Sequence, residues 1–140
     1  MKSAQPFRGV PAPPRERLCR AAFAAHPLPS FAAWSDTALA LWREACYREE
    51  RYCALALLAH PDYALHARSM AALPLFEECI VSGAWWDMVD TVAPRVGALL
   101  LEHPSEMAPL LRGRGLLCVC FVSALRPVCP SALSMSEQGK

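Results

Sequence analysis

Apolar residues recur at intervals of three and four along most of this 140-residue chain, a spacing that places them on one face of an α-helix. Four prolines among the first fourteen residues predict an extended segment before the first helix. Most later stretches of helical spacing end at a turn signal such as a His-Pro pair, because the residue before a proline is pushed out of the helical conformation. The pattern predicts helices over about residues 14–25, 35–46, 48–59, 70–83, 85–101 and 105–111.

The same spacing predicts the starts and the buried faces of these helices. The second helix is expected to begin at a cap provided by Ser35 or Asp36. Pro94 is expected in the first turn of a restarted helix, where a proline is tolerated. For the first three helices the buried faces are predicted to be Leu18, Ala21, Ala22 and Ala25, then Leu39, Trp42 and Cys46, then Tyr52, Leu55, Ala56 and Ala59.

No strand pattern precedes residue 115, so the sequence predicts an all-α fold. Successive apolar-striped helices joined by short turns favour antiparallel pairs stacked as a short α-solenoid. After residue 113 the character changes to a β-branched run over residues 116–122 and then a polar end. We therefore predict a helical domain over residues 1–113 and an unrelated, poorly ordered tail over residues 114–140.

Composition excludes several classes of protein. Hydrophobic residues make up 54% of the chain and charged residues 19%, which excludes a disordered linker. The net charge of +1 gives no overall basic field, although all of the basic residues except Lys2 and Lys140 are arginines. The longest apolar run, residues 115–125, is about half of what a membrane-spanning helix needs, and the N-terminus has no apolar signal segment. We expect an intracellular protein with no membrane partner.

The seven cysteines are an odd number and none has a C-x-x-C spacing, so reduced thiols are favoured over disulfides. Cys118, Cys120 and Cys129 lack a fourth ligand at a usual zinc spacing. We expect no metal site.

The stretch from Trp85 to Asp90 holds the most informative candidate chemistry. On a helix, Trp86 and Asp90 are one turn apart and share a face. An indole beside a carboxylate suits glycosidic-bond chemistry, because the ring supports a sugar or a cationic base and the anion stabilises an oxocarbenium-like centre. The structural alternative is that Asp87 is an N-cap, Asp90 an acidic first-turn residue and Trp86 a packing residue.

A second candidate lies around Arg48 and Arg51, which are three residues apart on a predicted helix and are spaced to hold a phosphate. Glu49 and Glu50 fall in the first turn of that helix, where negative charge is stabilised. The alternative interpretation is a solvated helix end whose charges pair with each other.

Three segments of the chain carry recognisable motifs. Met1, Lys2 and residues 5–11 have the form M-K-x-x-x-P-F-x-G-[IV]-P, and residues 48–55 have the form R-E-x-R-Y-x-A-L. Residues 86–97 have the form W-D-x-V-D-x-x-A-P-x-V-G, which is the specific motif of the three. In order and spacing, over roughly residues 1–113, the three resemble the DNA alkylation repair family of HEAT-like helical-repeat DNA glycosylases.

The resemblance implies a function and a site. Family members excise purines alkylated at N3 or N7, and Asp90 matches their catalytic carboxylate while Trp86 matches the aromatic residue beside the lesion's sugar. The implied partner is double-stranded DNA with alkylated bases, bound by a monomer. Arg48 and Arg51 are our candidate DNA contacts, and no metal or organic cofactor is implied.

The sequence also departs from the family. Members continue with further helix pairs, which supply an arginine from a W-x-R-R-like helix and another tryptophan, and some members have additional helices before the N-terminal segment. No such continuation follows Arg112. We therefore expect a domain that is incomplete at both ends and excises little alkylated purine. Two hypotheses stay open: a repair glycosylase impaired by truncation, and a non-catalytic helical-repeat module that binds DNA or protein.

Overall fold

The computed structural model describes residues 5–83 and 85–113, and over these residues every regular element is a helix. The all-α prediction is therefore confirmed for the described part of the chain, whereas the predicted tail lies outside it. The elements are α1 (Ala12–Ala25), α2 (Phe31–Arg43), α3 (Arg48–Leu58), the 3-10 turn η1 (Pro61–Tyr63), α4 (Ala64–Ala67), the 3-10 turn η2 (Met70–Ala72), α5 (Leu73–Gly83), α6 (Trp86–Glu102) and α7 (Pro104–Gly113).

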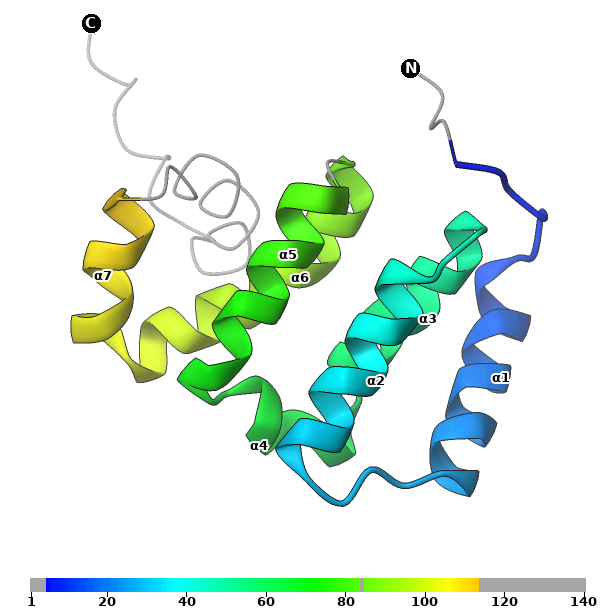
Figure 1. Ribbon diagram of the computed structural model, residues 1–140, viewed down its shortest axis with the longest axis horizontal. Helices are drawn as coiled ribbons and strands as arrows, with labels where there is room; N and C mark the ends of the chain where they lie inside the picture. Colours follow the sequence, from blue (N-terminus) through cyan, green and yellow to red (C-terminus); the bar gives the residue numbers. More distant parts are fainter. Residues whose placement is uncertain (1–4, 84, 114–140) are drawn as a thin grey trace, which may run out of the picture.

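The helices pack as antiparallel pairs. Short connections join α2 to α3 and α5 to α6, and the two helices of each pair lie against one another (Figure 1). Helix α3 also contacts α1 on one side and α6 on the other, and α7 packs on α6. Because α3 and α6 run in the same direction, the first turns of both helices lie at the same end of the molecule as the residues that lead into α1 (Figure 1).

Large side chains between the pairs form the core. Trp34 and Trp42 on α2 are fully buried, and the indole of Trp42 donates a hydrogen bond of 2.8 Å to the hydroxyl of Ser82 on α5. Gly83 lets α5 approach this ring, because a Cβ at that position would lie 3.1 Å from two carbons of the indole. The other large, fully buried side chains are Phe76, Leu57, Leu99, Met107, Val92, Val96 and Cys79.

Several predicted details of the helices are wrong. Helix α1 begins at Ala12 and buries Cys19 and half of Phe23, whereas Leu18 is 69% exposed. Helix α1 packs mainly on α3, so only a narrow stripe of its surface is buried, and Cys19 and Phe23, four residues apart, form that stripe. Helix α2 begins at Phe31 with Ser30 as its cap, since the Ser30 hydroxyl accepts a hydrogen bond from the Ala33 N–H, so neither Ser35 nor Asp36 caps it.

Helix α6 is continuous through Pro94, which contradicts the predicted restart. The ring of Pro94 faces solvent, and buried residues both before and after it pack against neighbouring helices. Tertiary packing therefore holds the helix together across the one hydrogen bond that proline cannot make.

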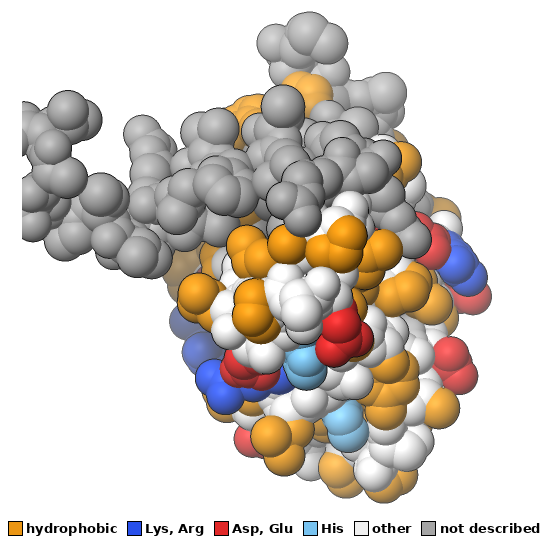
Figure 2. All heavy atoms as spheres, turned by 90° about the vertical axis from the view of Figure 1, so that its left-hand side faces the viewer, with side chains coloured by type: hydrophobic (Ala, Val, Ile, Leu, Met, Phe, Trp, Pro, Cys, Tyr) orange, Lys and Arg blue, Asp and Glu red, His pale blue; other side chains and the backbone are white. Residues whose placement is uncertain are grey.

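The surface of the described region combines charged and apolar side chains. Figure 2 shows apolar side chains gathered on the face that includes α7. The exposed large apolar residues are Phe7, Leu18, Leu65, Val81, Trp86 and Leu101. None of the helices in residues 5–83 and 85–113 is long and apolar enough to cross a membrane.

Candidate active site at the start of α6

Trp86 and Asp90 both lie on the solvent face of α6. Trp86 is the first residue of the helix and is 72% exposed, and Asp90 is exposed one turn later. The residues between them turn inward, since Met88 and Val89 belong to the core. Trp86 is therefore not a core packing residue, and its indole is available beside the Asp90 carboxylate on one helical face.

The same face continues along α6. Pro94 follows Asp90 by one turn and is exposed, Gly97 is half-buried, and Leu101 is 80% exposed. Residues four, eight and eleven positions after Trp86 share its side of the helix. Trp86, Asp90, Pro94 and Gly97 of the 86–97 motif thus lie on one side of α6, whereas Val89, Ala93 and Val96 of the same motif are buried.

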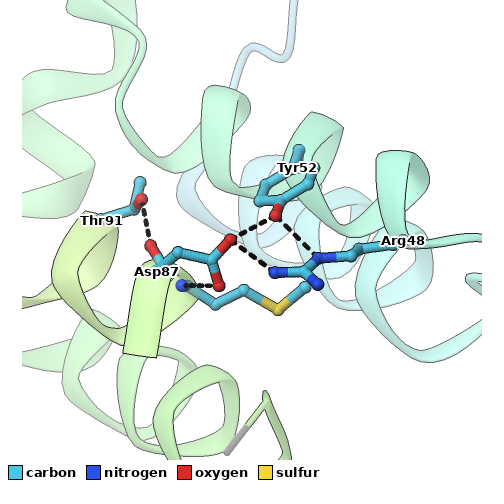
Figure 3. A network of polar contacts seen from close by, with 5 residues as sticks. Arg48, Tyr52, Asp87 and Thr91 are labelled. Atoms are coloured by element: carbon cyan, nitrogen blue, oxygen red, sulfur yellow. Dashed lines mark hydrogen bonds and ion pairs between the residues drawn. The ribbon is translucent and has the colours of Figure 1, made fainter. Parts of the chain in front are cut away.

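Asp87 points away from this face and toward α3. Its Oδ2 lies 2.6 Å from Nη2 of Arg48 and accepts a second, very short hydrogen bond from the hydroxyl of Tyr52 (Figure 3). Arg48 Nε donates to the Tyr52 oxygen at 2.8 Å, so the three side chains form a closed triangle between α3 and α6. We call Arg48, Tyr52 and Asp87 the Asp87 junction.

The Asp87 junction replaces a conventional cap at the start of α6. The expectation that Asp87 is the N-cap is wrong, because Trp85 occupies that position and makes no side-chain capping bond. Asp87 instead accepts the Met88 N–H at 2.9 Å through Oδ1, and the hydroxyl of Thr91 donates to the Asp87 carbonyl at 2.8 Å (Figure 3). One carboxylate therefore binds both its own first turn and the neighbouring helix.

Aromatic rings contact the arginines at the Asp87 junction, and burial and hydrogen bonds change the pKa values of its Tyr52 and Arg48. The guanidinium of Arg48 lies over the ring of Trp85 at 5.2 Å, and that of Arg15 lies over the ring of Tyr52 at 4.5 Å. Burial and the hydrogen bond to Asp87 raise the pKa of Tyr52, so its hydroxyl stays protonated and donates. Burial alone would lower the pKa of Arg48, but the bonds to Asp87 and Tyr52 outweigh it and raise that pKa.

The N-terminal segment, residues 5–11, is held by the first turn of α3. Oε1 of Glu49 accepts hydrogen bonds from the N–H groups of Arg8 at 2.8 Å and Val10 at 3.1 Å, around Gly9 with its positive φ of 78°. The N–H of Arg48 also donates to the carbonyl of Pro6 at 3.0 Å. Burial alone would raise the pKa of Glu49, but the backbone donors outweigh it and lower that pKa. The first-turn position of Glu49 was predictable from the sequence, whereas its attachment to residues about forty positions away was not.

Arg48 and Arg51 point to different neighbours. Arg48 is directed to α6 and its side chain is 17% exposed. Arg51 lies over the ring of Trp42 at 4.8 Å, and its Nη1 is 3.5 Å from the carbonyl oxygen of Ser82. Each guanidinium therefore has its own contacts within the protein.

A pair of cysteine thiols lies apart from α6. The thiols of Cys19 and Cys53 share a hydrogen bond between α1 and α3, which raises the pKa of Cys19 and lowers that of Cys53 to about 7. The four cysteines within the described residues are free, whereas Cys118, Cys120 and Cys129 lie outside them. Within that same region, no group of three His, Cys, Asp or Glu residues is arranged to hold a metal ion.

A comparison with protein-family models gives one result that covers most of the chain. Residues 1–112 match the family described as DNA alkylation repair enzyme. Searches of curated proteins and of solved structures gave no match. The matched range contains the N-terminal segment, the first turn of α3 and the exposed face of α6, the three parts that the site brings together. The chain therefore belongs to the DNA alkylation repair enzyme family, which indicates a role in DNA repair with DNA as the substrate.

Proposed function

We propose that this protein is a DNA glycosylase that removes purines alkylated at N3 or N7 from duplex DNA. The observation that carries the proposal is the exposure of Trp86 beside Asp90 on one face of α6, in a member of a DNA alkylation repair family. Leaving an indole 72% exposed forgoes the stabilisation that its burial would give, and such a surface is typical of a binding site.

The proposed reaction is hydrolysis of the N-glycosidic bond. A purine alkylated at N7 is already cationic, so it takes the bonding electron pair and leaves as a neutral base without prior protonation. Positive charge develops on the deoxyribose, where the Asp90 carboxylate stabilises it electrostatically. Water then adds to C1′ and releases a proton, which leaves an abasic site. Trp86 lies one turn before Asp90 and offers its ring to the same sugar.

Arg48 and Arg51 remain our proposed contacts to DNA phosphates. A guanidinium has five N–H donors, and the contacts described above use Nε and Nη2 of Arg48 and Nη1 of Arg51. Nε of Arg51 is buried, so the terminal N–H groups of the two arginines are the donors that suit a phosphate oxygen. The protein would therefore act in the cellular compartment that contains the DNA.

The direct test is identification of the product. Purified 140-residue protein in excess is incubated with methylated duplex DNA, and released bases are identified by mass spectrometry while abasic sites are counted in the DNA. With protein in excess we expect slow release of N7-methylguanine and N3-methyladenine above the spontaneous rate, each matched by one abasic site, in keeping with the low excision expected from the sequence. Binding to DNA with no base release above the spontaneous rate would reject the glycosylase in favour of a non-catalytic binding module.

A further inference from the structure

We propose that the Asp87 junction is a positioning device, which fixes the first turn of α6 and thereby places Trp86 for the reaction at Asp90. This inference rests on the proposed function and adds three positioning residues, Arg48, Tyr52 and Asp87, to it. Their hydrogen bonds join α3 to the first turn of α6, so they place Trp86 through the helix and not by touching the reacting sugar. For Arg48 this role is additional to its proposed contact with a DNA phosphate.

The Asp87 junction gives the first turn of α6 the side-chain hydrogen bonds that its cap residue does not provide, in addition to the buried side chains of Met88 and Val89 and their backbone bonds to the Trp85 carbonyl. The first N–H groups of a helix have no partners within the helix, and its first residues fray unless side chains satisfy them. Trp85 at the cap position provides no such bond. Oδ1 of Asp87 accepts the N–H of Met88, and Oδ2 fastens the same carboxylate to α3.

The Asp87 junction is also anchored at its far side. Arg48 donates through its backbone N–H to Pro6 in the N-terminal segment, and Arg15 of α1 lies on the ring of Tyr52. Arg48 further covers the ring of Trp85, immediately before Trp86. Each side chain of the Asp87 junction therefore has a second contact that limits its motion. Helix α3 holds the start of α6 through Trp85 and Asp87, the residues on either side of the exposed Trp86.

This arrangement explains why the three segments that resemble family motifs lie together. The N-terminal segment binds the first turn of α3, α3 binds Asp87, and Asp87 precedes Asp90 by three residues on α6. Small errors in the position of a reacting group cost about 100-fold in rate, so a side chain remote from the substrate can control catalysis through position alone.

The test combines a local spectroscopic signal with the reaction rate. The full chain is labelled with 5-fluorotryptophan, and the Trp86 resonance is assigned with Trp86→Phe. In Asp87→Asn we expect the resonances of Trp85 and Trp86 to shift and broaden while those of buried Trp34 and Trp42 stay unchanged. The single-turnover rate of base release should fall at least tenfold.

The matched control is Glu78→Gln, which removes another Arg–carboxylate pair between helices, the one with Arg43 at 2.5 Å. Its Trp86 resonance and release rate should equal those of the wild type. Tyr52→Phe keeps the ring under Arg15 and removes only the hydroxyl, so it provides the decisive spectrum if Asp87→Asn unfolds.

Two results would overturn the inference. One is an unchanged Trp86 resonance with a wild-type rate in Asp87→Asn, and the other is an unchanged Trp86 resonance in a folded Tyr52→Phe. Absence of base release by the wild type would reject the proposed function instead, and the fluorine spectra would still show whether the Asp87 junction orders Trp86.

Discussion

Glu49 and Asp87 occupy the same position, the second residue, of α3 and α6, and each carboxylate binds a segment far away in the sequence. Glu49 accepts two backbone N–H groups of the N-terminal segment, whereas Asp87 accepts the side chains of Arg48 and Tyr52. A negative charge near a helix N-terminus is stabilised by the helix dipole. Glu49 and Asp87 therefore gain stabilisation from their own helices as well as from their contacts with distant segments.

Glu49 makes the attachment of the N-terminal segment sensitive to acid. Because its folded-state pKa is below the ordinary value of 4.5, its contribution to stability is complete above about pH 4.5 and is lost as the pH falls through the lowered pKa. Glu49→Gln keeps an acceptor oxygen but removes the charge, and should lower the free energy of unfolding by about 2 kcal/mol at neutral pH. Urea unfolding at a series of pH values measures this difference.

The difference between wild type and Glu49→Gln should shrink as the pH falls below 4.5. Glu16→Gln on the exposed face of α1 is the control and should change stability little at any pH. A Glu49→Gln difference that grows on acidification would contradict the account.

At the scale of helices, periodicity was enough to predict that the helices exist and that α3 begins at Arg48, but not where α1 and α2 begin or which side α1 buries. In α1, Leu18 and three alanines have helical spacing, but so do Cys19 and Phe23 on another side of the same helix. Periodicity does not distinguish the two sides, and packing against α3 is what buries the side with Cys19. The Asp87 junction was beyond such reasoning, because polar partners 35 to 39 residues apart follow no period. That Trp86 and Asp90 share one exposed face was predictable, because they lie one turn apart on a single helix.

Pro94 should lower the stability of α6. Proline has no N–H to donate to the carbonyl of Asp90 and crowds the preceding turn. Because Pro94 is exposed, Pro94→Ala leaves the core unchanged and should raise the free energy of unfolding by about 1 to 3 kcal/mol, as measured by urea unfolding. Pro104→Ala is the control, since proline is tolerated at the first position of α7 and its replacement should have little effect. Equal stability of Pro94→Ala and the wild type would show that the packing of α6 already accommodates the proline.

For the whole molecule, the parallel directions of α3 and α6 bring their first turns to one end, together with the N-terminal segment (Figure 1). Trp86, Asp90 and the proposed arginine contacts therefore come from two helices that α3–α6 packing holds together. A net charge of +1 gives no strong general attraction for DNA, so binding must depend on a few local arginines.

Binding to duplex DNA should consequently be weak and fall steeply with salt, because each arginine–phosphate contact releases counterions. Arg48→Ala combined with Arg51→Ala should weaken binding. It should also reduce the slope of the logarithm of the binding constant against the logarithm of the salt concentration by the amount expected for about two lost phosphate contacts. Fluorescence anisotropy from low to moderate salt measures both. Arg17→Ala with Arg20→Ala on the exposed side of α1 is the matched control. An unchanged affinity in the first double variant at low salt would remove Arg48 and Arg51 from the DNA interface.

In the proposed reaction, the Asp90 carboxylate on the exposed face of α6 is the group on which base excision depends most. The most direct measurement is the single-turnover rate of N7-methylguanine release from a duplex with one lesion, compared between wild type, Asp90→Asn and the exposed control Asp62→Asn. Asparagine keeps the shape of Asp90 and removes its charge, so Asp90→Asn should release the base about 100-fold more slowly or worse, with an unchanged thermal transition. Asp62→Asn should match the wild type. Equal release by Asp90→Asn and the wild type, both above the spontaneous rate, would contradict the account.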